Sequence, residues 1–184
     1  FEGLVYQSNW HPPDIAPDPS LLQLVGYGMD FGYSNDQTAL VAIYKYRTKL
    51  RGIRSAIFCK TLIYEKQMFN SDISERVNVL RGDGKFSKSK YIVCDIAPKD
   101  IDELRITYKL KTVAAKKGAG SRVSGVAKCN DFDIHVLKSD PLNKERNTYS
   151  YVKIKGEDGK YKNEPADGND HALDGMRYGI TTLL

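Results

Sequence analysis

The stretch QLVGYGMDFG, residues 23–32, alternates large apolar side chains with glycine and aspartate. Successive side chains of a strand point to opposite faces, so Val25, Tyr27 and Met29 share one face, and two glycines share the other with Asp30. The pattern predicts a strand that ends on a carboxylate. Because glycine has no side chain, we expect the backbone before Asp30 to admit a bulky ligand.

Two more strands follow at short spacing. TALVAIYKYR (38–47) and SAIFCKTLIYEK (55–66) are rich in β-branched and aromatic residues, the composition typical of strands. Turn residues at 34–36 and a basic turn at 47–54 separate the three segments. Connections this short join antiparallel neighbours, so we predict a three-stranded meander.

The remainder of the chain alternates predicted helices with predicted strands. Periodicity and capping signals predict helices at 71–84, 98–110, 121–130 and from 169 onward, strands at 90–95, 112–118 and 133–138, and a β-hairpin at 149–163. A meander followed by crossovers implies an α/β fold, with a mixed central sheet and helices on both faces. The order of elements resembles the ribonuclease H-like arrangement, in which the first and fourth strands lie side by side at the sheet centre.

The chain divides into two parts on composition. Residues 1–20 are proline-rich and predict an irregular N-terminal arm or linker, with room for a short strand along the body. Residues 21–184 have the size and apolar content of one domain.

Three aspartates are predicted to converge. Asp30 ends the first strand and Asp95 the fourth, and ligands of open α/β sheets bind beyond the carboxyl ends of such strands. The terminal helix NDHALDGMRYG (169–179) places His171 and Asp174 three residues apart, on one face. A helix packed over that edge presents both side chains to the same place.

Carboxylates brought together repel one another unless cations neutralise them. Hard divalent cations prefer such oxygen ligands, so Asp30, Asp95 and Asp174 predict a site for two Mg²⁺ or Mn²⁺ ions, with His171 as a further catalytic residue. Two ions about 4 Å apart suit in-line displacement at phosphorus, which is the chemistry of phosphodiester hydrolysis.

Each of these residues also fits a simpler interpretation when taken alone. Asp30 could end a strand, Asp95 could begin a turn, and the polar residues of the last helix could cap it or face water. Glu65 is a further ligand candidate that fits a solvent-facing position better, and Asp36 and Asp167 fit turns. The sequence leaves the role of Asp170 open.

Positive charge is concentrated in the middle of the chain. The net charge is +5, but residues 85–162 hold 18 Lys and Arg against 10 Asp and Glu, or +8, which leaves −3 for the rest. A basic middle beside an acidic cluster favours a bound polyanion, with a solvated lysine-rich surface as the alternative. Lys116, Lys117 and Arg122, around the glycine-rich loop GAGSR, are the predicted DNA contacts.

Several classes of protein are excluded. No apolar run is long enough to span a bilayer, and no signal peptide opens the sequence. Three scattered cysteines without a CxxC pair argue against a disulfide framework or a zinc site and favour a reducing compartment. No GxxxxGK[ST] phosphate loop occurs. The first residue is not Met, which is consistent with a piece of a longer polypeptide.

Four segments together resemble a known family. GMDFGYSNDQTALV, VCDIAPKDIDEL, KKGAGSRVSGVAKCNDFDIHV and NDHALDGMRY resemble, in order and spacing, the nuclease domain of the large terminase subunit of tailed bacteriophages. The resemblance runs from Gly26 to Ile180. It departs from the family at Gly175, where alanine is more frequent, and at Ile96, where a small residue is usual.

This resemblance implies a C-terminal endonuclease that cuts double-stranded concatemeric DNA while an N-terminal ATPase domain drives the genome into a procapsid. By matched position, it implies that Asp30, Asp95 and Asp174 hold the metal ions, that His171 lies beside the last ligand, and that Lys117 lies near DNA. It also implies a small terminase subunit and a portal as partners, no membrane, and a location in the host cell cytoplasm, transiently at the procapsid portal.

Three other functions remain open on the sequence. Another ribonuclease H-like nuclease, such as a Holliday junction resolvase, would use the same carboxylates on branched DNA. An actin-like nucleotide-binding domain is suggested by MDFGYSNDQTA, which resembles a phosphate-binding hairpin. A basic DNA-binding module would leave the acidic residues with structural roles only.

Overall fold

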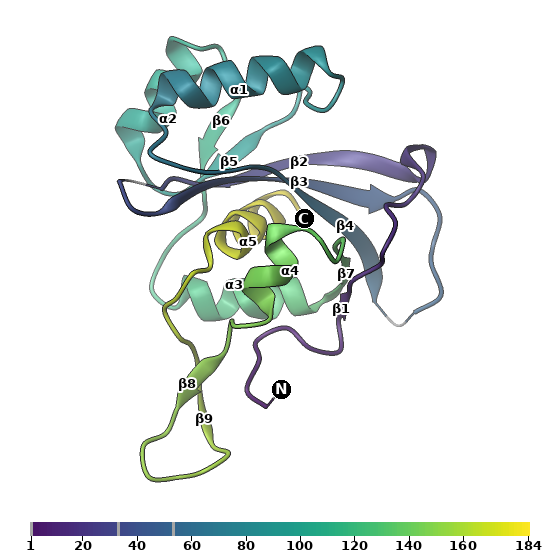
Figure 1. Cartoon of the computed structure of the whole chain (residues 1–184), viewed down its shortest axis with the longest axis vertical. Helices are drawn as coiled ribbons and strands as arrows, with labels where there is room; N and C mark the ends of the chain where they lie inside the picture. Colours follow the sequence, from purple (N-terminus) through teal and green to yellow (C-terminus); the bar gives the residue numbers. More distant parts are fainter. Residues whose placement is uncertain (1, 33, 53) are drawn as a thin grey trace.

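A seven-stranded mixed sheet with helices on both faces forms the body of the protein (Figure 1). The computed structural model describes residues 2–32, 34–52 and 54–184. The strands are β1 (Trp10–His11), β2 (Leu22–Asp30), β3 (Gln37–Tyr46), β4 (Ser55–Lys66), β5 (Ile92–Cys94), β6 (Thr112–Ala114) and β7 (Phe132–His135), with a separate hairpin of β8 (Tyr151–Lys153) and β9 (Tyr161–Pro165). The helices are η1 (Pro19–Leu21), α1 (Asn70–Gly82), α2 (Pro98–Ile106), α3 (Ser121–Asn130), α4 (Pro141–Arg146) and α5 (His171–Leu183).

The sheet has the order β1-β7-β4-β3-β2-β5-β6. The predicted meander is confirmed, because β3 pairs antiparallel with both β2 and β4. The predicted contact between the first and fourth strands is also confirmed, since β2 and β5 pair in parallel. The prediction that these two strands lie at the centre of the sheet is wrong. The middle strand is β3, because β7 and β1 extend the sheet in parallel beyond β4.

Each face of the sheet has its own hydrophobic core. Strand β3 is buried on both faces: Leu40 and Ala42 pack toward α1 and α2, whereas Val41 and Ile43 pack toward α3, α4 and α5. Figure 1 shows the same division, with α1 and α2 above the sheet and α3, α4 and α5 below it. Burial on both faces explains why TALVAIYKYR is nearly continuously apolar.

The two glycines of β2 serve a different purpose from the one expected. A Cβ atom at Gly28 would lie 1.8 Å from the carbonyl oxygen of Gly175, and one at Gly26 would lie 2.6 Å from Leu183 Cδ1. Helix α5 therefore occupies the space that we expected a ligand to enter. The glycines bring α5 directly onto β2, which carries Asp30 at its end.

The N-terminal segment is packed against the body. Trp10 and His11 add a short parallel strand to β7, and Tyr6 and Trp10 are buried in the core on the α5 side. The short strand allowed for in this segment is thus present. Residue 1 of the predicted arm lies outside the described residues, and the division of the chain at residue 20 stays a prediction.

The hairpin of β8 and β9 joins α4 to α5 in the chain and projects away from the body (Figure 1). Its exposed lysines include Lys153, Lys155, Lys160 and Lys162. In the part of the chain that the structure describes, no helix combines the length and apolar character needed to cross a membrane.

Candidate active site

Asp30 and Asp95 stand at the ends of two neighbouring parallel strands. Met29 of β2 is in register with Cys94 of β5, and the pairing continues as the Asp95 amide donates to the Met29 carbonyl at 3.1 Å. The two aspartates follow this last pair directly, one on each strand. Asp30 is 8% exposed. Burial raises its pKa, and the charges of Asp174 and Asp95 raise it further against the lowering effect of the hydrogen bond with His171.

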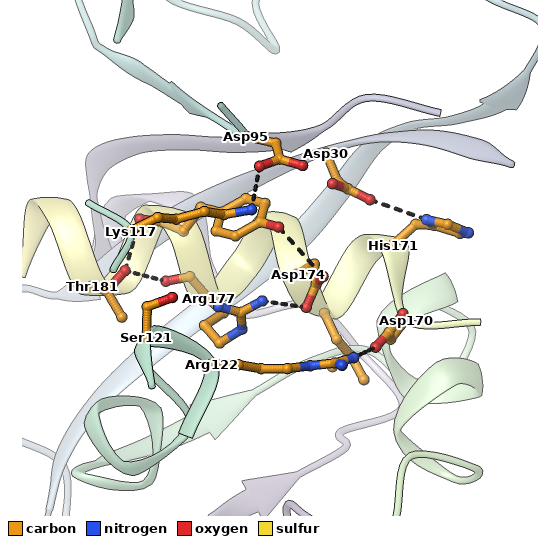
Figure 2. A network of polar contacts seen from close by, with 12 residues as sticks. Asp30, Asp95, Lys117, Ser121, Arg122, Asp170, His171, Asp174, Arg177 and Thr181 are labelled. Carbon is orange, nitrogen blue, oxygen red and sulfur yellow. Dashed lines mark hydrogen bonds and ion pairs between the residues drawn. The ribbon is translucent and has the colours of Figure 1, made fainter. Parts of the chain in front are cut away.

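Helix α5 brings the remaining predicted residues to this edge. His171 Nδ1 lies 3.0 Å from Asp30 Oδ2, and His171 Nε2 lies 3.7 Å from Asp36 Oδ1. The hydrogen bond with Asp30 is the main cause of a raised His171 pKa. Asp174 lies in the first turn of α5 on the same side (Figure 2).

These residues line a single open cleft of about 450 Å³. Its lining includes six aspartates, Asp30, Asp36, Asp95, Asp167, Asp170 and Asp174, and three permanent cations, Lys117, Arg122 and Arg177. With His171 neutral, the formal charge of the cleft is three minus six, or −3, in a chain whose net charge is +5. The structure therefore brings all three predicted ligands together in a cleft whose charge favours cations.

Each of the three predicted ligands, Asp30, Asp95 and Asp174, contacts a basic side chain. His171 contacts Asp30, Lys117 pairs with Asp95, and the Arg177 guanidinium donates to Asp174 at 2.6 Å (Figure 2). Arg177 was not among the residues predicted from the sequence. Its place three residues after Asp174 on a helix is the signal that could have found it.

The start of α5 is fixed by a residue that the sequence analysis missed. Glu145 of α4 is 2% exposed. Its carboxylate accepts hydrogen bonds from the amides of Ala172 and Leu173, at 3.1 and 2.9 Å, and from the Tyr64 hydroxyl at 2.8 Å. These amides are at the N-terminus of α5, where an acidic acceptor is favourable.

We expect Glu145→Gln to lower the free energy of unfolding by about 2 kcal/mol, because the backbone amide of Ala172 or Leu173 then loses its acceptor, and a buried donor without a partner costs about 1–3 kcal/mol. The amide keeps the shape of the side chain but only one of its acceptor oxygens. Urea denaturation followed by circular dichroism measures the change. The matched control is Glu164→Gln on the exposed strand β9, and equal midpoints for the two variants would contradict the role given to Glu145.

The three residues predicted to contact DNA differ in the contacts that they make within the protein. Lys116 is exposed. Lys117 pairs with Asp95. Arg122 pairs with Asp167 and Asp170, and so ties the start of α3 to the segment before α5. Whether these three side chains contact DNA stays a prediction.

Of the residues with open roles, Glu65 pairs with Arg76 and does not line the cleft, which agrees with the solvent-facing interpretation. Asp36 and Asp167, assigned to turns, do line it. Burial and the charge of Asp174 raise the pKa of Asp170 to about 6, although Arg122 lowers it.

The donor chemistry of the cleft fits divalent ions. Three carboxylates from three separate elements are the hard oxygen ligands that Mg²⁺ and Mn²⁺ prefer. Among residues 2–32, 34–52 and 54–184, no three His, Cys, Asp or Glu side chains are assembled around one metal position. The carboxylates of the three predicted ligands contact His171, Lys117 and Arg177 instead.

Comparison with known proteins gives likenesses in structure. No family model and no curated protein matches the chain. The large terminase nuclease domain of bacteriophage SPP1, solved with bound Mn, is similar with a TM-score of 0.76 at 21% identity, over 98% of each chain. The large terminase nuclease of thermophilic phage G20c, solved with bound magnesium, is similar with a TM-score of 0.59 at 12% identity, over 98% of this chain and 97% of that one.

A longer protein is also similar. The large terminase of a second thermophilic bacteriophage has a TM-score of 0.67 at 21% identity, and the match covers 99% of this chain but only 45% of that one. The chain thus spans less than half of that longer terminase. Together with the sheet order and the helices on both faces, these likenesses confirm the fold predicted from the sequence: the chain has the ribonuclease H-like fold of large terminase nuclease domains.

Proposed function

We propose that this chain is the nuclease part of a phage large terminase. It acts as a divalent-metal-dependent endonuclease that cuts concatemeric double-stranded DNA during genome packaging, by two-metal-ion phosphodiester hydrolysis. The observation that carries the proposal is the meeting of Asp30, Asp95 and Asp174 in one cleft, from β2, the end of β5 and α5. The solved terminase nuclease domains of the same fold, with bound Mn and magnesium, support it.

In this mechanism Asp30, Asp95 and Asp174 would hold the ions, and the charges of the other two carboxylates both act on Asp30. Bound divalent ions supply the acidity that activates a water and the positive charge that stabilises the leaving oxygen. His171 orients the Asp30 carboxylate through its Nδ1 contact. Arg177 is 5% exposed and orients Asp174, which belongs to the same helix.

The basic side chains around the cleft would hold the DNA. Lys117 and Arg122 line the cleft, the exposed Lys116 is the chain neighbour of Lys117, and the hairpin carries further exposed lysines away from the body. Contacts of this kind reach phosphates and carry no base information, so we expect weak sequence preference.

The rest of the full-length protein is also a matter of proposal. Structures of the longer thermophilic phage terminase, solved with ADP and with ATP-gamma-S, extend beyond the region matched here, which is 45% and 46% of those chains. We accordingly assign an N-terminal ATPase domain, a small terminase subunit and a portal as partners, and the host cytoplasm as the location, transiently at the procapsid portal.

Removal of the metal is the direct test. The purified chain, incubated with supercoiled plasmid and millimolar Mn²⁺ or Mg²⁺, is expected to produce nicked and linear DNA, and excess EDTA is expected to stop the reaction. Cutting that persists in EDTA would overturn the metal-dependent mechanism.

A second panel tests the substrate. Linear duplex and four-way junction DNA of equal length are expected to be cut at similar rates by a packaging nuclease. A strong preference for the junction would favour the resolvase alternative.

A further inference from the structure

The three cations at the ligand carboxylates differ in how firmly they are held. His171 and Arg177 are residues of α5, and Arg177 is packed so that a Cβ atom at Gly125 would lie 3.0 Å from its Cγ and Cδ atoms. Both side chains are more buried than that of Lys117, with 17% exposed for His171 and 6% for Arg177. Lys117 lies in the connection between β6 and α3, outside any regular element.

The connection around Lys117 is loosely packed. Its side chain is 29% exposed, and the next residues include Gly118 and Gly120, where an added Cβ would meet nothing within 4 Å. Gly120 has a φ of +72°, a conformation that glycine adopts at little cost. The anchor of the loop is one residue before Lys116, where the Ala115 amide donates to the Cys94 carbonyl at 2.7 Å.

Lys117 is also linked to Asp174, through the side chain of Tyr178. Its ammonium lies 4.6 Å from the centre of the Tyr178 ring, and the Tyr178 hydroxyl donates weakly to Asp174 Oδ2 at 3.4 Å. The ammonium therefore stands at Asp95, on the side of the cleft that faces Asp174. A positive charge is already present where the carboxylates require one.

We propose that Lys117 is a tethered counter-ion that occupies Asp95 until a divalent ion replaces it, and that the released ammonium then binds a DNA phosphate. This inference rests on the proposed function and adds a regulation of the same site. Metal and DNA then favour each other's binding: the ion frees Lys117 for the phosphate, and the phosphate draws Lys117 away from the ion's ligand. Such coupling is reciprocal by thermodynamic necessity.

The first test measures Mn²⁺ binding without DNA, by isothermal titration calorimetry of the wild type, Lys117→Met and Lys116→Met. Lys116 is the matched control, since its side chain is exposed and is not part of the lining of the cleft. We expect Lys117→Met to lower the Mn²⁺ Kd by about fivefold or more, in the range of typical coupling. Lys116→Met removes the same charge from the adjacent residue. We expect it to change the Mn²⁺ Kd by less than about twofold, because exposed charges are screened.

The second test follows release in the wild-type protein itself. Limited acetylation with an amine-reactive reagent, read by mass spectrometry, is expected to modify Lys117 more in the presence of Mn²⁺ than in EDTA, with Lys116 in the same peptide region unchanged. This readout does not depend on a variant or on cleavage.

The outcomes separate the two proposals. If the wild type binds Mn²⁺ but Lys117→Met binds it no more tightly than Lys116→Met, or if acetylation of Lys117 does not respond to the ion, the counter-ion role is overturned and the nuclease proposal stands. If neither the wild type nor Lys117→Met binds Mn²⁺, the proposed function fails, and the inference fails with it.

Discussion

Asp30→Asn is expected to reduce metal-dependent DNA cleavage by more than about 100-fold, since even residues that only support metal ligands contribute about 10- to 100-fold. The change replaces a charged oxygen with a neutral amide at the proposed metal site. Cleavage rates on plasmid DNA over a series of Mn²⁺ concentrations measure the loss. Binding of a labelled duplex in EDTA, followed by fluorescence anisotropy, is expected to survive.

The same variant is expected to keep or raise the melting temperature. Burial raises the pKa of Asp30, so the folded protein disfavours the carboxylate relative to the neutral form, and asparagine removes that cost at neutral pH. Asp83→Asn, at an exposed position just after α1, is the control and should cut normally. Undiminished cutting by Asp30→Asn would end the catalytic assignment.

Gly28→Ala is expected to lower the free energy of unfolding by at least about 3 kcal/mol, at the upper end of overpacking effects. Its Cβ would lie 1.8 Å from the Gly175 carbonyl oxygen and 3.0 Å from the Gly179 nitrogen, both backbone atoms that no rotamer change can move. Helix α5 would have to lift from β2. For a domain of this size, the melting temperature should fall by about 6–12 °C, measured by circular dichroism.

Two other glycines serve as controls for this prediction. A Cβ atom at Gly82 meets nothing within 4 Å, so Gly82→Ala should leave the melting temperature within about 2 °C of wild type. Gly175→Ala should be intermediate, since its Cβ would lie 3.2 Å from the Gly28 oxygen. A wild-type melting temperature for Gly28→Ala would show that α5 does not pack on β2 as described.

Much of the fold could be predicted because the signals are local. The alternation before Asp30 and the short turns around 34–36 and 47–54 were enough for the meander, which the strand pairing confirms. The order of elements, through its resemblance to the ribonuclease H-like arrangement, also placed Asp30 and Asp95 at the ends of neighbouring strands, with the last helix packed over that edge.

The parts that could not be predicted depend on contacts that are distant in sequence. Trp10 pairs with Ile134, a contact that no local pattern announces. Helix α4 has only six residues, too few for a periodic pattern, although the cap Asp140, whose carboxylate accepts from the Leu142 amide at 2.9 Å, followed by Pro141, is a recognisable start. We missed Glu145 for the same reason.

The glycines of β2 show a different limit. Their pattern correctly marked a place where something approaches the backbone closely, but it could not distinguish a ligand from a helix. The structure shows Gly175 and Gly179 of α5 there. Arg122 is similar: its pairing with Asp170 spans 48 positions, so a residue chosen for its charge proves to be engaged within the protein.

The contact between His171 and Asp30 joins side chains 141 positions apart. Helix α5 supplies His171, Asp174 and Arg177, and it follows the hairpin in the chain. On the proposed function, a polypeptide that is still being translated at the hairpin lacks one proposed metal ligand and two of the counter-charges, so we expect DNA cleavage only after α5 has been made and has docked.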